Sequence, residues 1–375
     1  MAEKKSRSRR QTSRPARKSG APLYAAVDLG TNNCRLLIAV PSRGGFTVVD
    51  SHSQIARLGE GLAESGRLSD AAMERAFSAL TAISGKIRAK KVGRVRCIAT
   101  EACRKAENGA EFIKEIRDRT GLTFKIIGAK EEARLALIGC HNLIDETAEN
   151  ILVLDIGGGS TELSLVDAAK ARDNGLSGML ERAPIKAWTS VPLGVVTLTE
   201  AFSYLPEAEA YPAMLAKARE YMESWADQHK VREALQGGGS HIIGTSGTVT
   251  CVAGVHFGLE RYRRDLVDGK WIERDSCLGT MQSLIDTDEA GRAKFPTIGE
   301  DRAGLMLAGC ALMEAAWGLA PQARMRVADR GLREGLLLSM MRGPKKRRRS
   351  RNRRGRSKAG QTSPNQTPPS QEAAE

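Results

Sequence analysis

Short apolar runs alternate with longer amphipathic stretches between residues 21 and 342 of this 375-residue chain. A helix is predicted to begin after Ser69, a favourable N-cap, because apolar side chains from Ala72 to Ile83 recur along one helical face. Short apolar or alternating segments bounded by turn residues are predicted as strands. The strands fall at 23–27, 34–40, 46–54, 95–99 and 123–127, and further helices at 111–119 and from Glu131 onward. This succession predicts an α/β layer architecture.

A strand, a glycine-containing turn and a second strand occur twice along the chain. The first unit, AAVDLGTNNCRLLIAV, contains Asp28, and the second, LVLDIGGGSTELSLV, contains Asp155, 127 positions later. In each unit, small or apolar residues lead into an aspartate, a hydrophobe and a glycine, followed by hydroxyl or amide side chains and another strand. An internal repeat of this size predicts two similar domains that face each other across a cleft, with both turns on its walls.

The two ends of the chain are basic and low in sequence complexity. Residues 1–20 carry eight Lys/Arg and one Glu, and residues 342–375 carry eleven Lys/Arg and two Glu. These ends supply all of the formal net charge of +14, so the body between them is slightly negative. Because they have almost no large apolar side chains, residues 1–20 and 343–375 are predicted to be disordered tails. Such basic tails can contact nucleic acid nonspecifically, can gather another polyanion, or can stay solvated without a dedicated partner.

Composition and motifs exclude several classes of protein. No apolar run approaches the roughly 18 residues of a membrane span, and no apolar stretch follows the basic N-terminus as a secretory signal would require. The seven cysteines are scattered and form no CxxC pair, so they are expected to be buried free thiols. The five histidines lack HxxxH spacing, which argues against a zinc site. We therefore expect a soluble, cytoplasmic protein whose metal ion would have oxygen ligands.

The segment from Asp155 to Glu162, DIGGGSTE, has the composition of a phosphate-binding loop. Three consecutive glycines cost on the order of 0.5–1 kcal/mol each in backbone entropy, and a structural turn rarely needs three. Their N–H groups can replace the hydration of phosphate oxygens, and Asp155 can supply a hard oxygen ligand to Mg²⁺. A glycine-rich hairpin is the alternative interpretation. The predicted phosphate-binding residues of this loop are Gly157, Gly158, Gly159, Ser160 and Thr161.

Two other segments carry weaker signals of the same kind. In the first repeat, Asp28 can hold Mg²⁺ through water or cap the turn, while Thr31 and Asn32 can bind phosphate. An ordinary β-hairpin turn explains that segment equally well. The segment IGTSGT follows an apolar stretch and precedes a predicted helix, whose N-terminus can bind another phosphate. The residues predicted to do so are Ser246, Gly247 and Thr248.

Taken together, the three loops resemble those of the actin, sugar-kinase and heat-shock-chaperone superfamily, and most closely those of the exopolyphosphatase and guanosine pentaphosphate phosphatase family. The resemblance rests on AAVDLGTNN, ATEACRKAEN, AKEEARLAL, LVLDIGGGSTEL, PLGVVTL, GTSGT and VADRGLREGLL, in family order from residue 25 to residue 338. It implies two actin-like (ribonuclease H-like) α/β domains of duplicated topology, 21–139 and 140–342, with the final helix packing back on the first. Long members of the family continue into a further helical region, so this chain looks like a short, two-domain member. The resemblance leaves its preferred substrate chain length and its processivity open.

The resemblance also implies catalytic residues. Glu132, the second glutamate of EEAR, would be the general base that takes a proton from the attacking water; an acidic first helical turn, with Glu131, is the alternative from composition. Arg104 corresponds to an arginine near the family's phosphate site, and a surface helix arginine is an equal alternative. Glu162 corresponds to a carboxylate that assists metal or water, and a solvent-facing strand residue is the alternative.

The predicted function is release of terminal orthophosphate from inorganic polyphosphate by attack of water, assisted by Mg²⁺ or another divalent cation. Guanosine pentaphosphate is the alternative substrate within the same family. Two other classes stay open: a nucleotide-driven kinase or chaperone of the same superfold, and a noncatalytic binder of polyphosphate or nucleic acid. The sequence leaves the oligomeric state open, with a homodimer among the candidates.

Overall fold

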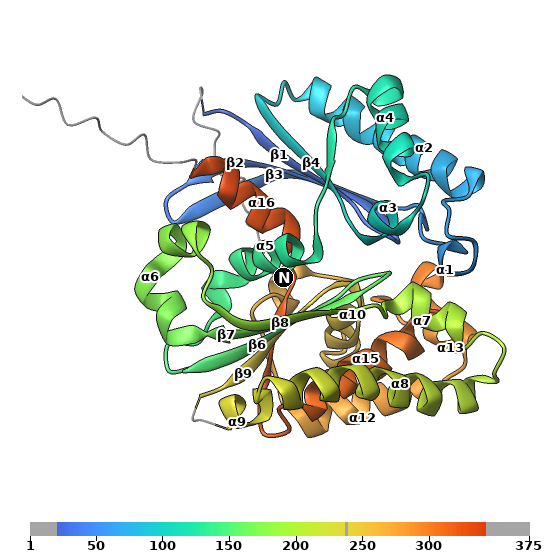
Figure 1. Ribbon diagram of the computed structural model, residues 1–375, viewed down its shortest axis with the longest axis vertical. Helices are drawn as coiled ribbons and strands as arrows, with labels where there is room; N and C mark the ends of the chain where they lie inside the picture. The colour runs from blue at the N-terminus through green and yellow to red at the C-terminus, as the bar shows by residue number, and fades with distance from the viewer. Residues whose placement is uncertain (1–20, 237–238, 343–375) are drawn as a thin grey trace, which may run out of the picture. The chain divides into compact units, whose positions relative to one another are not determined.

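The computed structural model of the protein describes residues 21–236 and 239–342. These residues belong to one compact unit, in which the strands form a five-stranded and a six-stranded sheet (Figure 1). The predicted tails, residues 1–20 and 343–375, lie outside the described residues. Among the helices of the described part, none combines the length and the apolar composition that crossing a membrane requires.

The first sheet contains the five strands predicted between residues 23 and 127, namely β1 (Tyr24–Leu29), β2 (Asn33–Ser42), β3 (Gly45–Ile55), β4 (Arg94–Ala99) and β5 (Phe124–Ile126). Their order is β3-β2-β1-β4-β5. The first three strands are antiparallel neighbours, whereas β1, β4 and β5 run parallel. The register of β1 and β2 sets Asp28 opposite Arg35, where β1 approaches its turn.

The second sheet contains six strands from the second half of the chain, namely β6 (Asn150–Ile156), β7 (Thr161–Asp167), β8 (Ile185–Val191), β9 (His241–Thr245), β10 (Trp271–Ile272) and β11 (Met325–Ala328). Read from β8, the order is β8-β7-β6-β9-β11-β10, and its first five strands repeat the arrangement of the first sheet. The predicted duplicated α/β topology of the actin-like fold is therefore confirmed. The domain boundary between residues 139 and 140 stays a prediction.

Helices connect the strands and cover the sheets. The predicted N-cap is confirmed, since the Ser69 side chain accepts a hydrogen bond from the Ala72 N–H at 3.3 Å. The helix predicted from Glu131 begins two residues earlier, at Ala129. The described helices are α1 (Leu62–Ser65), α2 (Asp70–Ala89), α3 (Glu101–Lys105), α4 (Gly109–Thr120), α5 (Ala129–Cys140), α6 (Ala168–Glu181), α7 (Val195–Ala201), α8 (Glu207–Gln228), α9 (Val231–Leu235), α10 (Gly247–His256), α11 (Arg264–Val267), α12 (Arg274–Ile285), α13 (Glu289–Ala293), α14 (Glu300–Ala303), α15 (Met306–Gly318) and α16 (Leu332–Met341).

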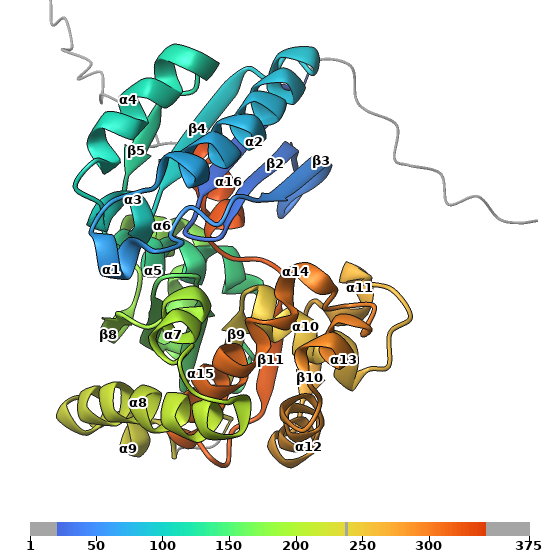
Figure 2. The same ribbon diagram turned by 90° about the vertical axis from the view of Figure 1, so that its right-hand side faces the viewer.

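Both faces of the first sheet are covered by helices. On one face α2 and α4 pack side by side (Figure 2), and Phe77 and Phe112 meet edge to face with ring centroids 5.1 Å apart. On the other face α5 and α16 pack against β1 through Leu135, Leu336 and Leu337 (Figure 1). Because α16 follows β11 of the second sheet, this contact joins the end of the described chain to the first sheet.

The seven cysteines are buried free thiols, as predicted. Burial raises the pKa of the Cys97 thiol to about 12, and burial likewise raises the pKa of the Cys310 thiol to about 12. Thiols with such pKa values stay protonated at neutral pH and act as small apolar side chains. We therefore assign the cysteines to the cores of the two sheets.

Two glycines let α5 and α16 meet backbone to backbone. A Cβ atom on Gly139 would lie 2.0 Å from the Gly331 carbonyl oxygen, and one on Gly335 would lie 2.0 Å from the Leu135 carbonyl oxygen. A backbone carbonyl cannot swing aside as the end of a flexible side chain can. Any larger residue at either glycine would therefore push the two helices apart and disturb the first turn of α16.

We predict that Gly335→Ala lowers the free energy of unfolding by about 1–3 kcal/mol, as overpacking of a close contact does. Gly85→Ala is the matched control, because a Cβ atom at this α2 position meets no atom within 4 Å. That control should raise the free energy of unfolding by about 0.5–1 kcal/mol. Urea denaturation of both variants measures the difference, and equal effects of the two substitutions would contradict the close helix contact.

Candidate active site

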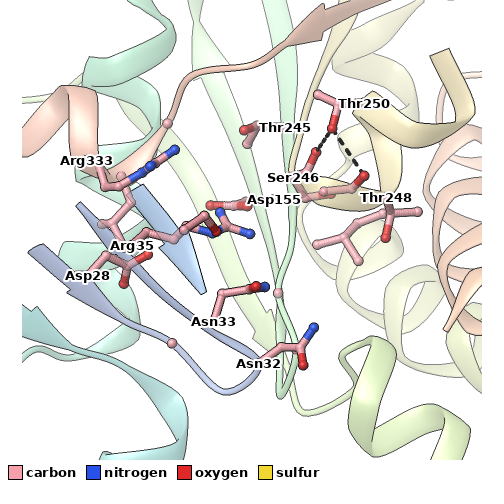
Figure 3. Close-up of a pocket in the computed structure, with 18 of the residues that line it drawn as sticks. Asp28, Asn32, Asn33, Arg35, Asp155, Thr245, Ser246, Thr248, Thr250 and Arg333 are labelled. Carbon is pink, nitrogen blue, oxygen red and sulfur yellow. Dashed lines mark hydrogen bonds between the residues drawn. The ribbon is translucent and has the colours of Figure 1, made fainter. Parts of the chain in front are cut away.

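A cavity of about 600 Å³ lies where the three glycine-containing segments meet (Figure 3). Its size is within the range of about 300–1,000 Å³ that is usual for ligand pockets. The wall is formed by the turn after β1, the β6–β7 loop, the N-terminus of α10 and the first turns of α5 and α16. The predicted site residues that line it are Asp28, Thr31, Asn32, Glu132, Asp155, Gly157, Gly158, Gly159, Ser160, Ser246, Gly247 and Thr248.

The β6–β7 loop presents two of its three glycine N–H groups for binding. The Gly157 N–H donates to the Ser160 carbonyl at 2.8 Å, which corrects the prediction that this N–H holds phosphate. The Gly157 and Gly158 carbonyls accept hydrogen bonds from N–H groups at the start of α7. The N–H groups of Gly158 and Gly159 have no hydrogen-bond partner among the described residues. They are therefore the groups of this loop that can bind an anion.

The same glycines also let three backbone segments approach closely. A Cβ atom on Gly158 would lie 3.0 Å from the Thr31 Cβ, and one on Gly159 would lie 2.8 Å from the Thr31 Oγ1. A Cβ atom on Gly194, just before α7, would lie 2.3 Å from the Gly158 carbonyl carbon. The glycine run is thus required for packing the β6–β7 loop against the first turn, as well as for exposing its N–H groups.

Three buried side-chain oxygens at the end of β1 lack a hydrogen-bond partner in the described part of the chain. They are Asp28 Oδ1, Asn32 Oδ1 and Asn33 Oδ1. A buried polar atom without a partner costs roughly 1–3 kcal/mol, so its retention indicates a ligand, an ion or water. Oxygen atoms of carboxylates and amides are the donors that Mg²⁺ accepts in proteins.

The described carboxylates on the cavity wall do not form a closed metal site. Within residues 21–236 and 239–342, no three side chains of His, Cys, Asp or Glu are arranged to hold a metal ion. Mg²⁺ commonly takes one or two carboxylates and completes its shell with water and substrate phosphates. Asp28 and Asp155 both line the cavity and can act as those carboxylates. These two carboxylates can therefore supply oxygen ligands of the kind that Mg²⁺ accepts.

Glu132 lies in the first turn of α5 and faces the cavity. Burial raises the pKa of its carboxyl well above the usual value, Glu162 and Asp155 raise it further, and Arg104 opposes them. Glu132 therefore holds a proton more tightly than a surface glutamate, which suits a general base. The alternative of an ordinary acidic helix turn describes Glu131 instead, since Glu131 forms an ion pair with an arginine of α5 at 2.7 Å.

Arg104 is beside Glu132 but is not among the residues that line the cavity. Its Nη1 donates to the Ile127 carbonyl at 2.7 Å and lies 3.5 Å from Glu132 Oε2, while its Nη2 pairs with Glu101. The side chain is 24% exposed, so the alternative of a freely solvated surface arginine does not describe it. Through these contacts Arg104 fixes the carboxylate of Glu132 relative to β5 and α3.

Two other predicted residues lie behind the cavity wall. Glu162 is 3% exposed and accepts hydrogen bonds from the hydroxyls of Ser160 and Ser190, so the alternative of a solvent-facing strand residue is wrong. Burial raises the pKa of its carboxyl. Thr161 is fully buried, and its hydroxyl donates to the Leu193 carbonyl at 2.7 Å. The structure therefore does not bring the Thr161 side chain to the cavity.

The N-terminus of α10 contains a strained residue. Ser246 has φ 135° and ψ 176°, a region that residues other than glycine rarely occupy. Such strain costs about 1–3 kcal/mol and persists mainly at functional sites. The Thr250 hydroxyl donates to the carbonyls of Ser246 and Gly247 at 2.9 and 3.1 Å and holds this turn in place (Figure 3). The strain supports the prediction of a ligand-binding turn here.

Five arginines on the cavity wall were not predicted from the sequence: Arg35, Arg264, Arg302, Arg330 and Arg333. Figure 3 shows Arg35 extending from β2 toward Asp155 and Arg333 entering from the start of α16. Burial raises the pKa of Asp155 to about 7, and the Arg35 charge partly offsets this. A sequence signal for Arg35 did exist, because it is the one charged residue in the apolar run 34–40.

Comparisons with known proteins agree on one family. The model of the Ppx/GppA phosphatase family matches residues 37–343. A Ppx/GppA family member from Aquifex aeolicus is 25% identical with a TM-score of 0.67, and the match covers 85% of this chain and 97% of that one. An exopolyphosphatase-like protein is 27% identical with a TM-score of 0.73, covering 85% and 99%. An exopolyphosphatase from Cytophaga hutchinsonii, 21% identical with a TM-score of 0.73 and covering 86% and 99%, has the same fold.

We predict that Asp155→Asn makes the protein's stability less sensitive to pH. Between about pH 4 and pH 7, Asp155 is protonated in the folded protein and ionised in the unfolded chain. The wild type therefore loses free energy of unfolding as pH rises through this window, at up to about 1.4 kcal/mol per pH unit from this group. Between pH 5 and pH 8, the free energy of unfolding of the variant should therefore rise relative to that of the wild type by about 1 kcal/mol or more.

Urea denaturation at pH 5 and pH 8 without divalent cations provides the measurement. Asp173→Asn is the control, because Asp173 is exposed on α6 and outside the cavity. The control should follow the wild type at both pH values. An identical pH dependence of Asp155→Asn and the wild type would mean that Asp155 is not desolvated.

Proposed function

The chain belongs to the Ppx/GppA phosphatase family, and from that premise we propose that it is an exopolyphosphatase that releases terminal orthophosphate from inorganic polyphosphate. One observation carries the proposal. Glu132, whose carboxyl pKa is raised, lines the same cavity as Gly158 and Gly159, whose N–H groups have no hydrogen-bond partner among the described residues. A base for water and an anion cradle are thereby within one pocket, as hydrolysis of a terminal phosphate requires.

Glu132 acts as the general base in the proposed reaction. It accepts a proton from water as the water oxygen attacks the terminal phosphorus in line with the departing chain. The bond between that phosphorus and the bridging oxygen breaks, and the shortened polyphosphate leaves as an anion. Arg104 acts as a positioning residue, because it touches Glu132 and not the cavity. Glu162, which lies behind the wall, raises the proton affinity of Glu132 by its charge.

The phosphoryl oxygens are held by backbone and side-chain donors. We assign the N–H groups of Gly158, Gly159 and the Thr31–Asn32 turn to the terminal phosphate, and the α10 N-terminus to a neighbouring one. Arg35 and Arg333 offset the charge of the following phosphates. Asp155 and Asp28 would hold Mg²⁺, which would supply the positive charge that screens the phosphates during transfer.

Guanosine pentaphosphate is the second candidate substrate. Tyr262 lines the cavity with a side chain that is 39% exposed, and Val48, also on the wall, is 40% exposed. An accessible aromatic face can stack on a nucleobase, whereas a chain of phosphates has no apolar group to place there. The exposed tyrosine is the observation that supports the second candidate, a nucleoside-bearing substrate. The substrate comparison below distinguishes it from polyphosphate.

We predict that Glu132→Gln lowers the rate of phosphate release about 10²- to 10⁴-fold, the usual contribution of a general base, and leaves polyphosphate binding within a factor of about two. Glu131→Gln is the adjacent control, since Glu131 is outside the cavity and should retain nearly full activity. Phosphate release and equilibrium binding are measured on the same preparations. Wild-type turnover in Glu132→Gln would rule out the assigned base.

We predict that the protein releases phosphate from long-chain polyphosphate and tripolyphosphate faster than from guanosine pentaphosphate or ATP. Excess EDTA should lower the rate by at least about 100-fold, and added Mg²⁺ should restore it, because one cation screens charge worth several kcal/mol in the transition state. The four substrates are compared in a phosphate-release assay. Preference for guanosine pentaphosphate would establish the second candidate, and preference for ATP would indicate a nucleotide-driven enzyme.

A further inference from the structure

A second cavity, of about 290 Å³, adjoins the first. Its walls are the β2–β3 turn, the end of α5 with the residues after it, and one side of α16. The two cavities share four lining residues, Val48, Arg264, Arg330 and Glu334. The two cavities are therefore neighbours that meet at these four residues.

The second cavity is predominantly cationic. Its lining contains three arginines, Arg43, Arg264 and Arg330, and a single carboxylate, Glu334. Glu334 is 3% exposed, and its Oε2 accepts a hydrogen bond from the Gly331 N–H at 2.9 Å. The Glu334 carboxylate also pairs with Arg264 at 3.3 Å, so the one negative charge of this lining is held in an ion pair. An anion in this cavity would meet more donors than repelling groups.

The three arginines differ in how freely they can contact a ligand. Arg330 pairs with Asp268 and is 27% exposed, while Arg264 contacts Glu334 at 3.3 Å and Asp329 at 3.5 Å and is 39% exposed. Arg43 is exposed at the tip of the β2–β3 turn and has no ion-pair partner within the described residues. The pKa of the neighbouring His141 is lowered, chiefly by burial and further by the positive charge of Arg330. Arg43 is therefore the cation most available to a bound anion.

The first cavity is large enough by itself for a short phosphate chain. Its volume of about 600 Å³ is in the range that encloses whole drug-sized ligands, and tripolyphosphate is smaller than these. A longer chain must continue beyond the cavity, and each further phosphate brings negative charge. On the adjoining wall, Arg43 offers positive charge along that path, next to the ion-paired Arg264 and Arg330.

We propose that the second cavity is a binding subsite for the internal phosphates of long polyphosphate chains, with Arg43 as its outermost contact. The proposal rests on the proposed function and extends it to chain-length preference. The terminal phosphate occupies the first cavity, and the chain passes Arg264 and Arg330 toward the β2–β3 turn. Tripolyphosphate is too short to use this subsite, so its binding does not depend on Arg43.

The test compares substitutions of Arg43 on two chain lengths. Arg43→Glu should raise KM for long-chain polyphosphate about three- to tenfold, Arg43→Ala should raise it less, and Arg43→Lys should keep it near the wild-type value. KM for tripolyphosphate should change less than about twofold in all three. Arg88→Glu is the matched control, an equal charge reversal on the exposed face of α2 away from both cavities, and it should change neither KM.

Binding measured by calorimetry in a Glu132→Gln background, where the chain is not shortened, separates this proposal from the proposed function. Weaker binding of the long chain alone on Arg43→Glu supports the subsite, even if the wild type released no phosphate and the proposed function failed. Equal effects of Arg43→Glu on both chain lengths, or no effect on either, would overturn the subsite. So would an equally large effect of Arg88→Glu, because general surface charge would then explain the result.

Discussion

Burial of four carboxylates, some of which also repel one another, is the constraint on which the candidate site depends. Asp28, Glu132, Asp155 and Glu162 each have a pKa raised chiefly by burial. They come from β1, α5, β6 and β7, so no single element can relieve the repulsion by a local change. A fold gains nothing in stability from gathering such groups, and perturbed carboxylates in one cavity are typical of sites that bind cations or move protons.

Close backbone contacts hold this unfavourable arrangement in place. Gly158 and Gly159 allow the β6–β7 loop to touch the turn after β1, which brings the aspartates of the two repeats to one cavity. Gly139 and Gly335 play the same part farther back, where α5 carrying Glu132 crosses α16 carrying Arg333. In both places, the absence of a Cβ atom lets two backbone segments pack closely. This close packing holds the side chains at the ends of those segments in fixed positions.

The net charge of the chain conceals how charge is arranged in its body. The basic ends account for the formal charge of +14, whereas the body is close to neutral. Within that body, carboxylates concentrate at the first cavity, and arginines line the path from Arg35 through Arg330 to Arg43. Carboxylates could bind a cation and arginines could bind a polyanion on neighbouring parts of the surface. A body that is nearly neutral as a whole can therefore bind a highly charged substrate.

Much of the fold and part of the site could be read from the sequence alone. The strands of the first sheet with their helices, the repeat, and the loop at Asp155 were predictable because periodicity and runs of glycine are local properties. Glu132 came from resemblance to a family, since its local sequence equally suits an ordinary helix turn. Arg302 and Arg333 could not be predicted with the same means, because arginines usually face solvent. Arg35 did have a sequence signal, as the one charged residue of an apolar run.

The sequence by itself determined the duplicated strand pattern, the two aspartate turns and the basic ends. Only the tertiary structure decided which groups remain available for chemistry. Gly157 and Gly158 look alike in the sequence, yet the Gly157 N–H is bonded within its own turn and the Gly158 N–H is not. Thr161 and Ser160 are likewise neighbours with different surroundings. The partner of the Thr161 hydroxyl is the Leu193 carbonyl, 32 residues away in the sequence, and local sequence carries no record of where such a segment will pack.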